Sequence, residues 1–159
     1  MSLNIRPARP GDGPLVNRLV RELAIYEKLD HEHVATDAMM EAALFGPDAR
    51  VSGDIAEWNG EAAGFTLWFY SFSSFEGRQG IYLEDLYVRE ELRGKGIGKA
   101  LIARLAKRCV DEKLARFEWS VLDWNTPSID FYKALGAKLM DGWTMCRVEG
   151  DALKALGGA

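Results

Sequence analysis

The chain has 159 residues, of which 48% are hydrophobic and 28% are charged, a composition that fits one soluble domain with a substantial core. It contains no apolar run long enough to span a membrane, no secretory signal pattern and only two cysteines, Cys109 and Cys146. These features argue against an integral membrane protein, a disulfide scaffold and a Cys-based zinc site, and they favour a cytoplasmic location. The net charge of -4 disfavours nucleic acid as a partner and is compatible with a cationic small substrate.

The first half of the sequence predicts a strand, two helices and a hairpin. A short strand is expected over residues 4–8. Apolar residues then recur at helical spacing after Pro14, which predicts a helix from residue 12 or 13 to about residue 29. Thr36 is expected to cap a second helix over 37–44. The alternating strand 50–58 and the aromatic strand 63–72 flank Asn59-Gly60, a strong two-residue hairpin turn.

The second half alternates strands with helices. The expected elements are a polar loop over 73–80, a strand over 81–88, a Gly- and Arg-rich connection over 89–98, a helix over 97–113, a strand over 117–122, a helix over 126–135 and a last strand over 143–148. Val110 is expected to face inward, and the chain is expected to loosen over 153–159. The order predicts a single α/β domain over residues 1–159, with a mixed sheet, one βαβ crossover and helices on both faces.

The connection between the strand 81–88 and the helix that follows reads Arg93-Gly94-Lys95-Gly96-Ile97-Gly98-Lys99. Alternate glycines let a ligand approach the backbone N–H groups, and the helix N-terminus adds partial positive charge. The pattern therefore favours a pyrophosphate site, although a plain Gly-rich turn is the alternative. The spacing does not fit the Walker loop, and Lys99 stands where the dinucleotide-binding pattern requires its third glycine.

This loop resembles the Arg/Gln-x-x-Gly-x-Gly/Ala loop of the GNAT family of N-acetyltransferases. Residues 82–88 resemble the strand that precedes that loop in the family, and residues 124–132 resemble the segment that follows its next strand. Together with residues 23–27, these runs are similar to the diamine acetyltransferase branch, which includes spermidine/spermine acetyltransferases and relatives that prefer thialysine. The resemblance extends over about residues 5–149.

The resemblance implies a mixed, mostly antiparallel sheet with a splayed central βαβ unit, and direct transfer of the acetyl group of acetyl-CoA to a primary amine. It implies that the backbone of Leu86, Tyr87 and Val88 pairs with the pantetheine arm and polarises the thioester. It further implies that the pyrophosphate is held by Arg93, Gly94, Lys95, Gly96, Ile97, Gly98 and Lys99. Dimers are usual in this branch, through the C-terminal strands, so a homodimer is expected.

Two adjacent carboxylates, Glu84 and Asp85, interrupt the apolar strand 81–88. Strand alternation points them to opposite faces unless a bulge intervenes. Because burying a carboxylate is costly without a partner, an ion pair with a nearby cation is one explanation. The other is a pocket for an amine. The resemblance favours Glu84 as a substrate contact and water-mediated base, with Asp85 as a second anion for a diamine.

Asn125 and Tyr132 lie seven residues apart, on one side of the predicted helix 126–135. Capping alone could explain Asn125 before Thr126-Pro127, and core packing could explain Tyr132. The resemblance implies instead that Tyr132 is the acid that protonates the coenzyme A thiolate. It also implies that the cofactor contacts come from Asn125, Thr126, Pro127 and Ser128.

The remaining predicted substrate residues come from two separate segments. The resemblance suggests that Tyr26 and Glu27 form a lid over the amine and that Glu118, Trp119 and Ser120 wall the same pocket. The pair His31 and His33 has i, i+2 spacing in a loop without a third ligand, so a surface turn is expected there and no metal site.

The sequence thus predicts an acetyl-CoA-dependent N-acetyltransferase acting on a small cationic amine, either a diamine or polyamine or a thialysine-like amino acid. Two alternatives stay open. One is an acetyltransferase of a protein amine. The other is a non-catalytic regulator that binds acyl-CoA, against which the joint presence of Glu84, Asn125 and Tyr132 argues.

Overall fold

The computed structural model describes residues 2–158 and divides the chain into two compact units, one ending at Ser120 and the other beginning at Val121. The first unit contains a five-stranded sheet in the order β1 (Leu3–Pro7), β2 (Ser52–Trp58), β3 (Glu61–Ser73), β4 (Arg78–Val88) and β5 (Phe117–Glu118). Neighbouring strands are antiparallel except β4 and β5, which are parallel. The predicted mixed, mostly antiparallel sheet is confirmed.

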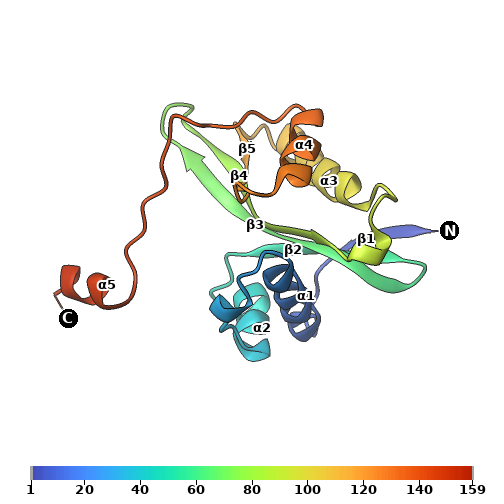
Figure 1. The fold of residues 1–159 in the computed structure, drawn as a ribbon, viewed down its shortest axis with the longest axis horizontal. Helices are drawn as coiled ribbons and strands as arrows, with labels where there is room; N and C mark the ends of the chain where they lie inside the picture. Colours follow the sequence, from blue (N-terminus) through green and yellow to red (C-terminus); the bar gives the residue numbers. More distant parts are fainter. Residues whose placement is uncertain (1, 159) are drawn as a thin grey trace. The chain divides into compact units, whose positions relative to one another are not determined.

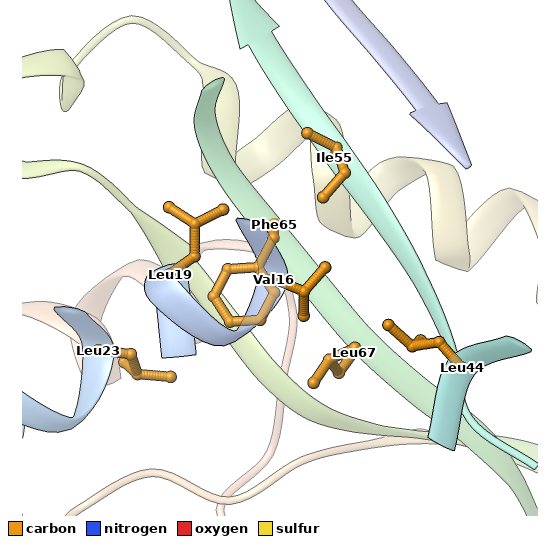
Figure 2. Packing of buried hydrophobic residues seen from close by; sticks show 7 residues of the cluster. All are labelled: Val16, Leu19, Leu23, Leu44, Ile55, Phe65 and Leu67. Carbon is orange, nitrogen blue, oxygen red and sulfur yellow. The ribbon is translucent and has the colours of Figure 1, made fainter. Parts of the chain in front are cut away.

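Helices cover both faces of this sheet (Figure 1). Helices α1 (Gly13–Tyr26) and α2 (Asp37–Phe45) lie on one face, and α3 (Ile97–Asp111) lies on the other. Figure 2 shows the core beneath α1 and α2, which consists of Val16, Leu19, Leu23, Leu44, Ile55, Phe65 and Leu67. A second core on the α3 face consists of Ala56, Ala63, Ile97 and Leu101. Because successive strand residues point to opposite faces, neighbours such as Ile55 and Ala56 serve different cores.

Local signals place the first unit's helices and turns as predicted. The Thr36 side chain accepts a hydrogen bond of 3.1 Å from the Met39 N–H and so caps α2. Asn59 and Gly60 have φ values of 51° and 85° and form the β2–β3 turn. Two short 3-10 turns, η1 (Asp30–Glu32) and η2 (Glu90–Leu92), complete the unit.

The second unit contains α4 (Thr126–Ala134) and α5 (Gly150–Leu156). Gly136, at a φ of 97°, ends the α4 region, where the Ala137 N–H donates to the Tyr132 carbonyl at 3.1 Å. Within residues 2–158, no helix combines the length and the apolar character that crossing a membrane requires.

Three predictions about the C-terminal part were wrong. The strand expected over 117–122 is the two-residue β5, and the segment 143–148 forms no strand. A strand needs a hydrogen-bonded neighbour, and Trp143, Met145 and Val148 are instead exposed. Of the residues expected to loosen, 153–156 belong to α5, whose Asp151 and Lys154 suit the dipole at its two ends, and Ala159 lies outside the described residues.

Val110 and Cys146 also differ from the prediction, which placed Val110 inward and Cys146 in a strand. Val110 is 76% exposed, because it lies five residues after the buried Leu105, about 140° around the helix. Cys146 is exposed in an irregular segment rather than packed in a strand.

Candidate active site

A β-bulge in β4 brings the two adjacent carboxylates to the same face of the sheet. Leu67 pairs with Asp85 and Trp68 pairs with Leu83, so Glu84 is the extra residue without a cross-strand partner. Leu67 belongs to the core beneath α1, and its partner Asp85 therefore points toward that face. The sequence left the relative orientation of Glu84 and Asp85 open, and the bulge decides it.

Asp85 is the most strongly perturbed carboxyl group of this unit. Its pKa is raised to about 7, chiefly by burial and additionally by the negative charges of Glu84 and Glu27. Burial also raises the pKa of Glu27. Asp85 forms no ion pair with any residue in the described part of the chain, so the ion-pair explanation for it does not hold. Glu84 is exposed beside it.

The C-terminal half of α1 is fixed to the end of β4 by an ion pair that the sequence did not reveal. The Arg89 guanidinium donates to both carboxylate oxygens of Glu22, at 3.1 and 2.9 Å. The Tyr87 hydroxyl donates to the same carboxylate at 3.4 Å. This arrangement holds the end of α1 against β4, where the charge of Glu27 acts on Asp85. Because Glu22 and Arg89 lie far apart in sequence, no spacing signal could have found them.

The glycine-rich loop leaves the N-terminus of α3 without a side-chain cap. Gly94 and Gly96 adopt φ values of 80° and 81°, which glycine accepts readily, and Gly96 is the N-cap of α3. The first N–H groups of any α-helix lack intrahelical acceptors, and glycine offers no side chain to bind them. These N–H groups, with the exposed Lys95 and Lys99 nearby in sequence, fit an anionic group such as a pyrophosphate.

Strands β4 and β5 diverge beside the carboxylates. Their parallel pairing comprises only Ile81 with Phe117 and Tyr82 with Glu118, whereas β4 continues to Val88. The splayed βαβ unit is therefore confirmed. Past the last paired residue of β5, Glu118, the Ser120 and Tyr82 hydroxyls lie 2.8 Å apart. This hydrogen bond between Tyr82 and Ser120 was not predicted from the sequence.

Trp119 packs its ring against Phe117 at 4.9 Å, and Glu118 is exposed on β5. The first unit therefore brings together the predicted residues of α1, β4, the glycine-rich loop and β5. The other predicted residues belong to the second unit.

In the second unit, Asn125 is the N-cap of α4. Its side-chain oxygen accepts a hydrogen bond of 3.3 Å from the Ser128 N–H, and Asn125 is buried. The capping explanation for Asn125 is confirmed. Tyr132 is half-buried in α4, with its ring 5.5 Å from that of Phe131. Thr126 and Pro127 form the first turn of the helix, where proline is well tolerated.

His33, the C-cap of η1, has a structural role, and His31 is exposed within η1. The Nε2 atom of His33 lies 2.9 Å from the Oδ1 atom of Asn17, and Asn17 also donates to the Ala35 carbonyl at 3.1 Å. Asn17 is buried in α1, so this contact joins the loop before α2 to α1.

Comparison with known proteins identifies the family of this arrangement. The profile of the Acetyltransferase (GNAT) family matches residues 17–137, which include the bulged β4, the glycine-rich loop and α4. The chain belongs to the GNAT family. It is therefore an acyltransferase, and the resemblance noted in the sequence is confirmed.

Individual relatives extend the likeness over nearly the whole chain. A thialysine N-epsilon-acetyltransferase of Bos taurus is 38% identical and covers 97% of this chain and 96% of its own length. An L-ornithine N5-acetyltransferase of Arabidopsis thaliana is 32% identical, with coverages of 98% and 88%. Among solved structures, an integron cassette protein from the mobile metagenome of V. cholerae has a TM-score of 0.84 at 25% identity, covering 100% of this chain and 99% of its own.

Proposed function

We propose that this GNAT protein transfers the acetyl group of acetyl-CoA directly to a primary amine of a small cationic substrate, a diamine or polyamine or a thialysine-like amino acid. The proposal rests above all on three carboxylates: Glu84 and Asp85 at the bulge of β4, the strand that precedes the glycine-rich loop, and Glu27 at the end of α1, whose charge acts on Asp85. Such a cluster suits a substrate with two cationic centres. Thialysine and ornithine, named for two relatives, are amino acids of this kind.

Acetyl-CoA fits the loop and the adjoining strand. The uncapped N-terminus of α3, with Lys95 and Lys99, would hold the pyrophosphate. The backbone of Leu86, Tyr87 and Val88 would pair with the pantetheine arm where β5 no longer pairs with β4. Bound there, acetyl-CoA supplies an activated acetyl thioester.

A carboxylate at the bulge would remove the proton that the attacking ammonium must lose. An alkyl ammonium is mostly protonated at neutral pH, so a nearby base is useful. Glu84 is exposed at the bulge and can act directly or through a water molecule. Asp85, with a pKa of about 7, serves as the second anion that recognises the distal cation of the substrate. Tyr26, Glu118, Trp119 and Ser120 complete the substrate pocket.

The second unit supplies the remaining groups of the proposed mechanism. Tyr132 would protonate the departing coenzyme A thiolate, while Asn125, Thr126, Pro127 and Ser128 would contact the cofactor. The family match extends across the boundary between the units to residue 137, which supports one acetyltransferase domain over residues 1–159.

A release assay for free thiol tests the proposed activity. The wild-type protein is incubated with acetyl-CoA and, in turn, putrescine, spermidine, thialysine, ornithine, lysine and a peptide with a free N-terminus. Thiol release with the small dications supports the proposal. Release with the peptide alone supports an acetyltransferase of protein amines, and coenzyme A binding without release for any amine supports a regulator.

We further propose a cytoplasmic homodimer that uses the C-terminal segment. Trp143, Met145 and Val148 are 78%, 70% and 49% exposed, which is costly for a soluble chain unless a partner covers them. Light scattering after gel filtration should give twice the monomer mass of 17.7 kDa, and Trp143→Ser should shift it toward the monomer. A monomeric wild-type protein at micromolar concentration would contradict the dimer.

A further inference from the structure

Arg93, the first residue of the glycine-rich loop, extends its side chain to the end of α1. Its Cζ atom lies 4.6 Å from the centroid of the Tyr26 ring and 5.8 Å from that of Tyr87. Its Nε donates to the Val88 carbonyl at 3.0 Å. The guanidinium is thereby held against two aromatic rings and the end of β4.

This arrangement differs from those of the neighbouring cations. Arg89, which directly follows β4, forms an ion pair with Glu22, whereas Arg93 forms no ion pair with a described residue. Lys95 lies two residues further along the loop, and its Nζ atom lies 5.4 Å from the Trp58 ring on β2. Of these two loop cations, Arg93 contacts the end of α1, whereas Lys95 lies against β2.

Tyr26 directly precedes Glu27 in the sequence. Glu27 is the C-cap residue of α1, and its negative charge is one of those that raise the pKa of Asp85. The hydroxyl of Tyr87, the other residue under Arg93, donates a hydrogen bond to Glu22, which holds its ring in place. Arg93 consequently contacts both a ring held on β4 and the ring of the residue that directly precedes Glu27. A movement of the loop would be transmitted to Glu27 through this contact.

We propose that Arg93 is a positioning residue for the amine acceptor, which links the glycine-rich loop to the carboxylates through Tyr26. This inference rests on the proposed function, in which the loop binds acetyl-CoA and the carboxylates bind the amine. Arg93 then sets the affinity for the amine even when the loop is saturated with acetyl-CoA.

A double-mutant cycle of Arg93→Gln, Tyr26→Leu and the double variant tests this link. KM for the amine is measured at saturating acetyl-CoA, and coenzyme A affinity is measured by calorimetry. Each single variant should raise the amine KM roughly 3- to 10-fold, about the size of one or two cation–π contacts. The double variant should be no worse than the poorer single variant, because both remove the same link. Multiplicative effects on KM would overturn the proposal.

Lys95→Gln is the matched control, because it removes a neighbouring loop cation that does not contact Tyr26. It should weaken coenzyme A binding and leave the amine KM at saturating acetyl-CoA unchanged. An equal rise in amine KM for Lys95→Gln would overturn the proposal, since general loss of positive charge would then explain both. Arg93→Lys, which keeps the charge over the ring but not the planar donor, should recover part of the loss.

A failure of the proposed function can be told apart from a failure of this inference. If the wild-type protein acetylates none of the amines, the activity assignment fails. The contact between Arg93 and Tyr26 is then tested by urea unfolding of the wild type, the two single variants and the double variant. Non-additive changes in the free energy of unfolding would support the link between Arg93 and Tyr26. Additive changes would overturn it.

Discussion

Glu27, the C-cap of α1, raises the pKa of Asp85 in β4, although the two residues belong to separate elements of the chain. Burial is the largest cause of the raised pKa of Asp85, followed by the charge of the exposed Glu84 and then by that of Glu27. The result is a carboxyl group that titrates near neutral pH at the bulge where the amine substrate is proposed to bind.

The first prediction concerns stability. The folded-state pKa of Asp85 is about 7 and lies above its unfolded value, so the folded protein binds more protons between these two values. The free energy of unfolding of the wild type should therefore fall as pH rises from about 4 to about 7. Asp85→Asn removes this loss, so its stability relative to wild type should increase over the same window, by at most about 4 kcal/mol. Urea unfolding at a series of pH values measures the difference, and a constant difference would contradict the prediction.

The second concerns amine binding. A bound dication favours the ionised form of Asp85 and so lowers its pKa. Binding should therefore release protons near pH 7, and affinity should rise between pH 6 and pH 8. Calorimetry in two buffers of different ionisation enthalpy measures the number of protons released. Asp85→Asn should abolish the release, and an undiminished release in that variant would assign the titrating group elsewhere.

A third prediction concerns Gly96, the N-cap of α3, which has a φ of 81° and no side chain to cap the helix. Gly96→Val should weaken coenzyme A binding strongly while the protein stays folded, because the strained backbone no longer presents its N–H groups correctly. Gly60, with a φ of 85° and open space around it, lies in the β2–β3 turn and gives a control of equal strain. Gly60→Val should cost similar stability and leave coenzyme A affinity unchanged. Equal affinities for wild type and folded Gly96→Val would refute the assignment.

A fourth prediction concerns Tyr132 of α4. Removal of a general acid typically lowers the rate roughly 10²- to 10⁴-fold. Tyr132→Phe keeps nearly all of the packing volume, so kcat should fall steeply while coenzyme A affinity and Tm change little. If the hydroxyl has only a structural role, Tm should fall and kcat should stay near that of wild type.

Tyr70→Phe is the control for this variant. It removes an exposed hydroxyl that donates at 2.7 Å to Glu112, the C-cap residue of α3. Its kcat should equal that of wild type, which would show that loss of a bonded tyrosine hydroxyl does not in itself impair turnover.

Local sequence determined much of this fold. The spacing of Val16, Leu19 and Leu23 specifies the apolar face of α1, Thr36 specifies the start of α2, and Asn59-Gly60 specifies the hairpin. These signals act within a few residues, because helical periodicity, capping and turn conformations depend on neighbouring positions alone. The glycine-rich loop was recognisable for the same reason, since its conformation depends on the glycines themselves.

Tertiary structure decided what depends on partners distant in sequence. The bulge that places Glu84 and Asp85 on one face comes from the register of β4 against β3, which no local pattern encodes. The Glu22–Arg89 ion pair and the contact of Arg93 with Tyr26 join α1 to the far end of β4. Segment 143–148 shows the converse, because its strand-like sequence has no neighbouring strand in the described chain and forms no strand. A strand, an ion pair and a perturbed pKa each require a second group whose position only the folded chain supplies.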